Sequence, residues 1–95
     1  MGAEPAGRAS RVDFFLKKEG VLLETKMTRE GLTDGKLGEV LIIDIARYKQ
    51  RPECKALVCF VYDPDHRLTN PAGLENDLSK ITDALEVHVF IRPKS

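Results

Sequence analysis

The chain has little cysteine, no long hydrophobic run and no excess of charge of either sign. Its two cysteines, Cys54 and Cys59, have no second pair and no histidine at ligand spacing, which argues against a zinc site. A buried Cys59 thiol would suit the reducing cytoplasm better than a disulfide framework. The longest apolar run, residues 40–43, is far shorter than the roughly 20 residues that span a bilayer, so no membrane partner is expected. Residues 1–11 have no apolar stretch between their charges, and we expect no secretory signal there.

What is present is a balanced set of charges in a short chain. Lysine and arginine together number 15, as do aspartate and glutamate, so the chain does not hold nucleic acid by bulk basicity. A local basic patch can still contact phosphates. With 95 residues, 42% of them apolar and 32% charged, we expect one soluble domain with one hydrophobic core. The candidate members of the basic patch are Lys17, Lys18, Lys26, Arg29 and Lys36.

The hydrophobic patterning predicts strands and helices in the order ββαβαβ. Residues 1–10 contain glycine and proline without periodicity, and we expect them to be a flexible lead-in to a single domain over residues 11–95. Two runs around a glycine-containing turn predict a β-hairpin, and the middle strand-helix-strand unit implies a parallel crossover. The predicted fold class is therefore α/β with a mixed sheet. The predicted elements are strands over 11–16 and 21–27, a helix over 37–51, a strand over 55–62, a helix over 70–81 and a strand over 86–92.

Two of these elements are apolar on more than one side. Ile42 and Ile43 add a second apolar face to the first helix, and the strand over residues 55–62 is apolar on both faces. We therefore expect both elements to be covered on two sides. In a chain this short, a second copy can supply missing cover.

The predicted hairpin carries charged residues of the types that bind metal ions and take part in catalysis. Glu24 and Lys26 are two apart on one strand, so their side chains share a face, which we expect to be exposed. Asp13 faces Glu24 directly if the turn is centred on Lys18-Glu19, and it faces Lys26 if the turn is centred on Glu19-Gly20. A three-residue loop would turn Asp13 to the other side. Two carboxylates on one face suit Mg²⁺ or Mn²⁺, and a lysine beside them can orient or deprotonate a water or steady developing charge.

Other polar residues have a structural explanation beside a functional one. Asp44 and Tyr48 are one helical turn apart and either aim at the active face or make hydrogen bonds within the helix or at the edge of the core. The turn at residues 63–65 and the adjacent His66 are explained more simply by turn chemistry than by a metal site. His88 lies among apolar neighbours and is predicted to be a structural or edge histidine.

An ordinary ion-pair ladder on an exposed strand is the alternative explanation for Asp13, Glu24 and Lys26. An acid on one strand, followed by an acid-x-Lys motif on the next, favours an active site instead. The segments that matter are Val12-Asp13-Phe14, Glu24-Thr25-Lys26, Ile43-Asp44-Ile45-Ala46-Arg47-Tyr48 and Cys59-Phe60-Val61-Tyr62-Asp63-Pro64. Through these segments the chain resembles the PD-(D/E)xK nuclease superfamily and, more narrowly, the small DpnII/MboI-like restriction-endonuclease domains.

The resemblance implies a fold, an activity and residue roles. Asp13 and Glu24 would be metal ligands, the main-chain carbonyl of Thr25 a third ligand and Lys26 the catalytic lysine, with Mg²⁺ or Mn²⁺ as cofactor. The restriction-endonuclease-like fold has a helix and a strand before the Asp-bearing strand. Residues 1–10 offer no counterpart to them, so we expect a fold truncated at the N-terminus. Val40 stands where the resemblance leads us to expect a glutamine.

Two functions follow from these patterns. The first is metal-dependent phosphodiester hydrolysis of DNA by a small restriction-endonuclease-like domain. The alternative is a non-catalytic homodimeric interaction module built on a truncated nuclease fold. In such a homodimer the two hairpins would meet near residues 11–16, where Val12, Phe14 and Leu16 lie opposite Asp13 and would lack cover.

Overall fold

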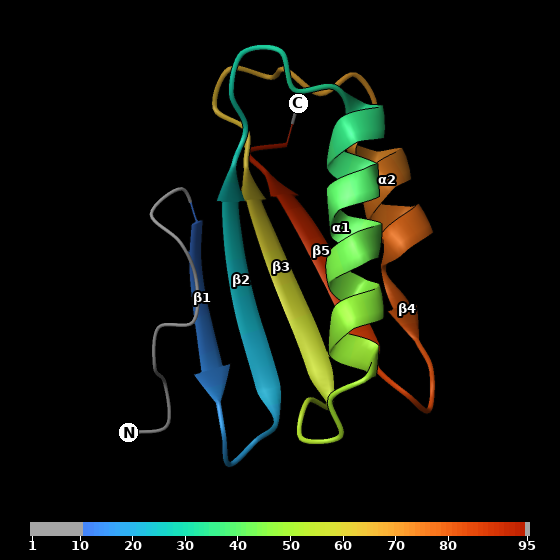
Figure 1. The fold of residues 1–95 in the computed structure, drawn as a ribbon. Helices are drawn as coiled ribbons and strands as arrows, with labels where there is room; N and C mark the ends of the chain where they lie inside the picture. Colours follow the sequence, from blue (N-terminus) through green and yellow to red (C-terminus); the bar gives the residue numbers. More distant parts are fainter. Residues whose placement is uncertain (1–10, 95) are drawn as a thin grey trace.

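The computed structural model describes residues 11–94, and for Arg11 and Val12 it describes the main chain only. The predicted lead-in over residues 1–10 lies outside this part of the chain. The predicted order of elements is confirmed, with the two-residue strand β4 added (Figure 1). The elements are β1 (Arg11–Leu16), β2 (Val21–Met27), α1 (Asp34–Lys49), β3 (Ala56–Tyr62), α2 (Pro71–Leu78), β4 (Lys80–Ile81) and β5 (Glu86–Arg92).

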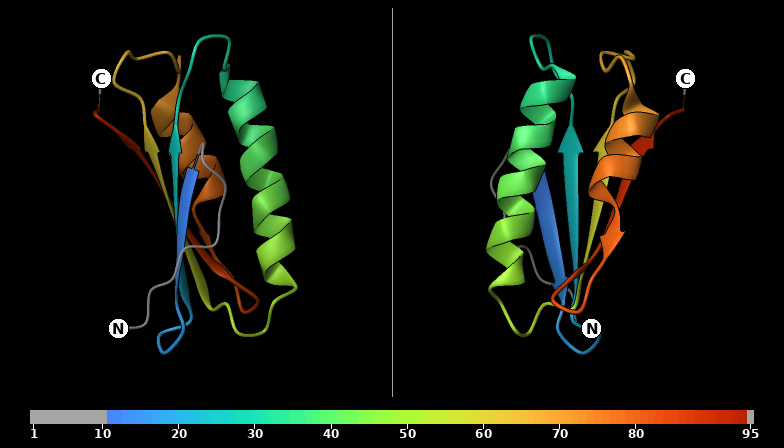
Figure 2. Two further views of the ribbon diagram at one scale, coloured as in Figure 1. Left: turned by 60° about the vertical axis from the view of Figure 1, so that its left-hand side comes forward. Right: turned by 90° about the vertical axis from the view of Figure 1, so that its right-hand side faces the viewer.

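The strands form a five-stranded mixed sheet in the order β1-β2-β3-β5-β4. β1 and β2 are an antiparallel hairpin, β2, β3 and β5 run parallel, and β4 pairs antiparallel with β5. Helices α1 and α2 connect the parallel strands, and both lie on the same face of the sheet (Figures 1 and 2). The predicted α/β class with a mixed sheet is confirmed. Neither helix of the described chain is long and apolar enough to cross a bilayer.

The boundaries of α1 follow its capping residues. The Thr33 hydroxyl accepts a hydrogen bond from the Lys36 N–H at 3.2 Å, so the helix begins at Asp34, before the predicted start at residue 37. It ends at Lys49, shortly before Pro52. Its buried positions recur at helical spacing and turn one side of the helix to the sheet. They include Leu37, Leu41, Asp44 and Tyr48.

Helix α2 begins as predicted and ends earlier. The Asn70 side chain accepts a hydrogen bond from the Gly73 N–H at 3.1 Å, and Pro71 fills the first helical position. A Cβ on Gly73 would collide with the Asn70 side chain, which explains the glycine. The helix ends at Leu78 instead of residue 81, because the chain then turns to pair with β5 as β4.

The core lies between the sheet and the two helices. Alternate residues of each inner strand point into it, and the predicted alternation of β5 is confirmed. Both cysteines are free and buried, as expected for Cys59. The main contributions from the sheet are Leu22, Leu57, Cys59, Val61, Val87, Val89 and Ile91, and α1 adds Leu37 and Leu41.

The opposite face of the sheet exposes several apolar side chains and carries no helix within residues 11–94 (Figure 2). Phe60 and Phe90 are direct partners on β3 and β5, and they are 38% and 40% exposed. Ile42 and Ile43, on the outer side of α1, are exposed as well. The prediction that β3 and α1 are covered on both sides is therefore wrong for this part of the chain. β1 forms one edge of the described sheet, and Phe14 on it is half-buried.

Candidate active site

The β-hairpin sets the positions of Asp13 and Glu24. The two residues are direct partners in the β1–β2 ladder, which is the first of the two predicted registers. The turn of residues 17–20 holds this register: Gly20 has a φ of 71°, and its N–H donates to the Leu16 carbonyl at 2.8 Å. Both carboxyl groups lie on the face that the helices cover, and both residues are 0% exposed. Two opposed carboxyl groups are thus buried between the hairpin and α1.

Lys26 lies two residues beyond Glu24 on the same face of β2. Its Nζ is 3.8 Å from Glu24 Oε1 and 3.2 Å from Asp44 Oδ2 on α1. The Lys26 side chain is only 12% exposed. The expectation that this face is exposed is therefore wrong, because α1 covers it. Asp13, Glu24 and Lys26 consequently do not form a ladder on an exposed strand.

Asp44 is the third carboxyl group of this cluster. It lies on α1 and is buried, and its Oδ1 is 3.8 Å from Arg47 NH1 on the solvent side. Of the two explanations for Asp44 in the sequence, the structure supports the one that aims it at the acid-x-Lys motif. The signal was present in the helical period: residue 44 continues the buried series that begins with Leu37 and Leu41.

The electrostatics of the cluster centre on Glu24. Burial raises the pKa of Glu24, the Lys26 ammonium lowers it, and the charges of Asp44 and Asp13 raise it again, to about 7. A side-chain hydrogen bond with Asp44 contributes in the same direction. Near neutral pH the cluster therefore holds a proton in a large fraction of molecules. Burial is the largest cause of this shift, and the Lys26 ammonium only partly offsets it.

Cys59 contacts the cluster from β3. Its Sγ donates to Glu24 Oε1 at 3.6 Å. Burial raises the pKa of the Cys59 thiol far above its ordinary value, and the neighbouring Glu24 raises it further. The thiol therefore stays protonated and does not act as a nucleophile.

The chemistry of the donors fits a hard divalent cation. Within residues 11–94 no group of three or more His, Cys, Asp and Glu side chains is arranged to bind a metal ion. However, Asp13 and Glu24 offer oxygen ligands from facing positions, and Mg²⁺ is commonly held by one or two carboxylates and several waters. A cation held by these carboxyl groups would favour the ionised form of Glu24, which burial and the neighbouring carboxylates disfavour.

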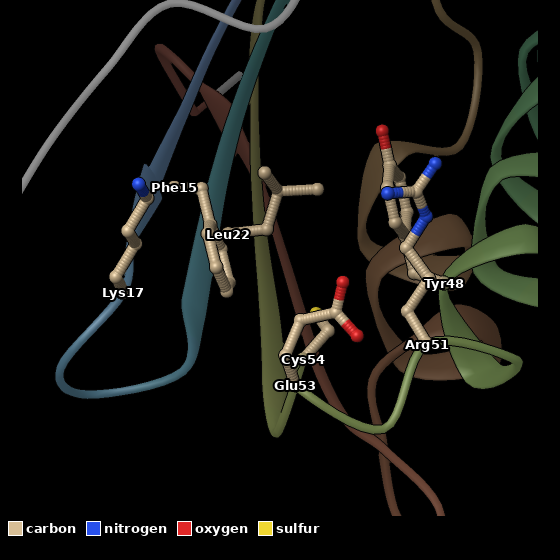
Figure 3. A pocket seen from close by; sticks show the side chains of 7 residues that line it. All are labelled: Phe15, Lys17, Leu22, Tyr48, Arg51, Glu53 and Cys54. Carbon is tan, nitrogen blue, oxygen red and sulfur yellow. The ribbon is translucent and has the colours of Figure 1, made fainter.

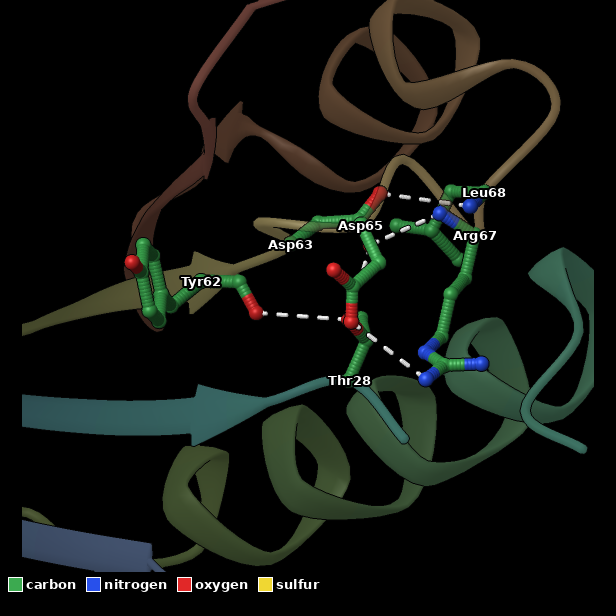
Figure 4. Close-up of polar contacts among 6 residues, drawn as sticks. All are labelled: Thr28, Tyr62, Asp63, Asp65, Arg67 and Leu68. Carbon is green, nitrogen blue, oxygen red and sulfur yellow. Dashed lines mark hydrogen bonds and ion pairs between the residues drawn. The ribbon is translucent and has the colours of Figure 1, made fainter. Parts of the chain in front are cut away.

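The residues at 63–66 do the structural work of a turn (Figure 4). Asp63 Oδ1 accepts hydrogen bonds from the Thr28 hydroxyl at 2.7 Å and from the Arg67 N–H at 2.9 Å, and its Oδ2 accepts from the Leu68 N–H at 3.2 Å. Asp65 forms an exposed ion pair with Arg67. The turn explanation is confirmed, and these residues join the end of β3 to the end of β2.

Two further predictions concern His88 and the basic patch. His88 has a structural role, since it pairs with Glu86 at 2.6 Å and stacks on Phe90. It is not an edge histidine, because β5 lies between β3 and β4 in the sheet. The five basic residues do not form a single patch. Lys26 is partly buried under α1, Lys17 and Lys18 lie in the hairpin turn, and Arg29 and Lys36 follow the other end of β2, in the loop after it and in the first turn of α1.

The fold defines the class of protein to which the chain belongs. A mixed sheet begins with an antiparallel hairpin and continues through parallel crossovers with two helices, which is consistent with a restriction-endonuclease-like domain. A family model described as REase_DpnII-MboI matches residues 2–94, and the chain belongs to this DpnII-MboI restriction endonuclease family. At this level the family implies DNA binding and DNA cleavage, and its enzymes typically use a divalent metal ion. Neither the curated proteins nor the solved structures include a match to the chain.

Proposed function

We propose that the chain is a metal-dependent nuclease that hydrolyses the phosphodiester bonds of DNA, with Asp13, Glu24 and Lys26 as its catalytic residues. These residues would fill the acid and acid-x-Lys signature of the PD-(D/E)xK superfamily, which the family implies. One observation carries the proposal: the side chains of Asp13, Glu24 and Lys26 lie close together with that of Asp44, between the hairpin and α1. A buried carboxyl group beside other charged groups, with its pKa raised mainly by burial to about 7, is typical of a functional site.

Each residue has a distinct role in this mechanism. Asp13 and Glu24 would hold Mg²⁺ or Mn²⁺, with the main-chain carbonyl of Thr25 as a further ligand. When bound, such an ion lowers the pKa of a water and offsets the negative charge of the scissile phosphate. The Lys26 ammonium would orient the attacking water and steady the negative charge that develops on the phosphate. Asp44, 3.2 Å from Nζ, keeps the ammonium group in place.

Cleavage of DNA by purified variants tests the proposal. Lys26→Ala should lower the rate of Mg²⁺- or Mn²⁺-dependent cleavage by about 10²-fold or more, because it removes a positioned acid-base or electrostatic group. Asp77→Asn changes an exposed carboxyl group on α2 and should cleave like the wild type. Absence of metal-dependent cleavage of single- and double-stranded DNA by the wild type would reject the catalytic function.

Calorimetry tests the metal site without any substrate. Asp13→Ala should abolish the binding of Mn²⁺, because it removes one of two facing carboxylates. The Asp77→Asn variant again serves as the control. An Mn²⁺ affinity that is unchanged in Asp13→Ala would leave the cluster as a structural ion pair.

The uncovered face of the sheet favours a second candidate function, a non-catalytic homodimeric interaction module. Phe60 and Phe90 lie together on this face, and Met27 beside it is 60% exposed. Exposed apolar patches of this kind commonly mark interfaces, and a second copy of the chain would bring the same patch. A homodimer is also compatible with the nuclease. We place the protein in the cytoplasm, where the buried free thiols of Cys54 and Cys59 suit a reducing medium.

A further inference from the structure

A cavity of about 600 Å³ lies between the β1–β2 hairpin and the end of α1 (Figure 3). Three of the residues that line it lie on the same elements as the cluster. Phe15 is two residues after Asp13 on β1, and Leu22 is two residues before Glu24 on β2, so both share the face of the carboxyl groups. Tyr48 is one helical turn beyond Asp44 on α1. The cavity therefore continues the candidate active site toward the hairpin turn.

The lining combines aromatic rings with charged groups. Phe15 comes from the sheet and Tyr48 from α1, with Leu22 between them, so the interior is mainly apolar (Figure 3). Lys17 and Arg51 bring positive charge, and Glu53 brings one carboxyl group. Aromatic faces stack with nucleic acid bases, and cationic side chains attract phosphates. Glu53 and the apolar interior make a lone inorganic anion a poorer fit than a nucleotide.

Hydrogen bonds hold the segment that carries Arg51 and Glu53. The Cys54 N–H donates to the Arg51 carbonyl at 3.0 Å. The Lys55 and Ala56 N–H groups both donate to the Gly20 carbonyl, at 2.7 and 3.1 Å, which ties this segment to the hairpin turn. The main chain of this segment is therefore held in place without a ligand, and binding need order only the exposed side chains that line the cavity, such as Arg51 and Glu53.

We propose that this cavity binds one unpaired nucleotide of a DNA strand, beside the phosphate that the carboxyl cluster cuts. The position relative to the cut rests on the proposed function, whereas the binding itself needs no metal ion. A base within a duplex is stacked and paired, so it enters such a cavity only from a single strand or after leaving the stack. The protein should therefore prefer single-stranded or locally unpaired DNA to an intact duplex.

The test is fluorescence anisotropy with a labelled single-stranded oligonucleotide, and with the duplex of the same sequence, in EDTA so that no cleavage occurs. The single strand should bind about fivefold or more tightly than the duplex. Arg51→Glu should weaken binding of the single strand by about tenfold, and Phe15→Leu, which keeps the apolar volume but removes the ring, by about fivefold or more. Lys49→Glu makes the same change of charge on an exposed residue outside the cavity lining, and it should weaken binding by less than about threefold.

Equal losses in Arg51→Glu and Lys49→Glu, unchanged binding in Phe15→Leu, or equal affinity for duplex and single strand would overturn the inference. Circular dichroism of each variant separates a lost contact from a lost fold. Failure here and failure of the proposed function give different results. A protein that cleaves DNA but ignores the Arg51 and Phe15 changes has the proposed function without this binding site. A protein that binds the single strand as described but cleaves nothing has the binding site without the activity.

Discussion

Lys26 is held by carboxyl groups from two different elements, and only one of them belongs to the acid-x-Lys motif. Glu24 is its neighbour on β2, whereas Asp44 reaches it from α1 and is the closer of the two. The geometry of the lysine therefore depends on how α1 packs on the hairpin. This dependence makes Asp44 the residue whose change best separates positioning of Lys26 from chemistry.

Asp44→Asn should lower kcat for DNA cleavage by about tenfold or more, with little change in KM, because Lys26 loses the partner that fixes Nζ. The variant should remain folded, since it also removes a charge that raises the pKa of Glu24. Steady-state kinetics and urea unfolding measure both effects. Arg47→Ala, which removes only the exposed partner of Asp44, is the control.

A purely structural Asp44 gives the reverse pattern. Breaking a buried ion pair by removing one partner costs about 3–5 kcal/mol. A loss of that size in the free energy of unfolding, together with an unchanged kcat, would show that Asp44 only stabilises the fold.

Residue patterns predicted which groups lie on one face, but not how deeply they are buried. The period of two on β2 placed Glu24 and Lys26 together, and the turn left two registers for Asp13. The exposure of Lys26 depends on α1, which is distant in sequence, so no local pattern could reveal it. Asp44 was visible as a charged residue in a buried helical series, but the hydrogen-bonding alternative has the same sequence signature.

At the scale of elements, the order of strands and helices followed from periodicity, whereas their ends followed from particular side chains. Helix α1 begins at Asp34 and not at residue 37, because the Thr33 hydroxyl accepts a hydrogen bond from an N–H of the first turn. β4 escaped prediction because Lys80 and Ile81 are both exposed and form this strand through main-chain pairing with β5. Such pairing leaves no alternation of apolar and polar residues to read.

The turn after β3 offers a prediction on stability. In Asp63→Asn, an amide nitrogen that cannot accept replaces one carboxylate oxygen, so either the Leu68 N–H or both the Thr28 hydroxyl and the Arg67 N–H lose their acceptor. The free energy of unfolding at pH 7 should fall by about 1–3 kcal/mol. Asp65→Asn, which removes only an exposed ion pair, should change it by less than about 1 kcal/mol. Urea unfolding compares the two variants, and equal losses would contradict the assignment.

The same turn predicts a dependence on pH. Burial by itself would raise the pKa of Asp63, but the hydrogen bonds from Arg67, Thr28 and Leu68 hold it below its ordinary value. A carboxyl group with a lowered pKa in the folded state stabilises the fold above its unfolded pKa of about 3.9, and this stabilisation is lost as the pH falls through the folded value. The difference between wild type and Asp63→Asn should therefore shrink in acid. A difference that stays constant down to the acid transition would show that the charge of Asp63 is not involved.

At the scale of the whole molecule, the two faces of the sheet differ in what covers them. Both helices cover the face with the carboxyl cluster, while the other face exposes Phe60 and Phe90 within the described chain (Figure 2). We predict that two copies associate through this uncovered face. Phe60→Glu should shift the protein toward monomer, because it would bury a charge in an apolar interface, and Phe14→Glu on β1 should act in the same way.

Light scattering at tens of micromolar measures this equilibrium. Ile42→Glu makes the same kind of change on the outer side of α1 and should remain dimeric. A wild type that is monomeric at this concentration, or a Phe60→Glu variant that is still dimeric, would rule out the association.

The pairing of Asp13 with Glu24 has a consequence for how such a gene can change over generations. Side chains on a strand alternate between faces, so inserting or deleting one codon within the turn at residues 17–20 would turn either β1 or β2 over. The turned strand would carry its proposed catalytic acid to the opposite side of the sheet, while the other strands and both helices kept their own periodicities. A single small insertion or deletion could therefore silence the candidate enzyme and leave most of the remaining sequence recognisable. Silent descendants of this domain should be sought by the length of this turn as well as by the loss of acidic residues.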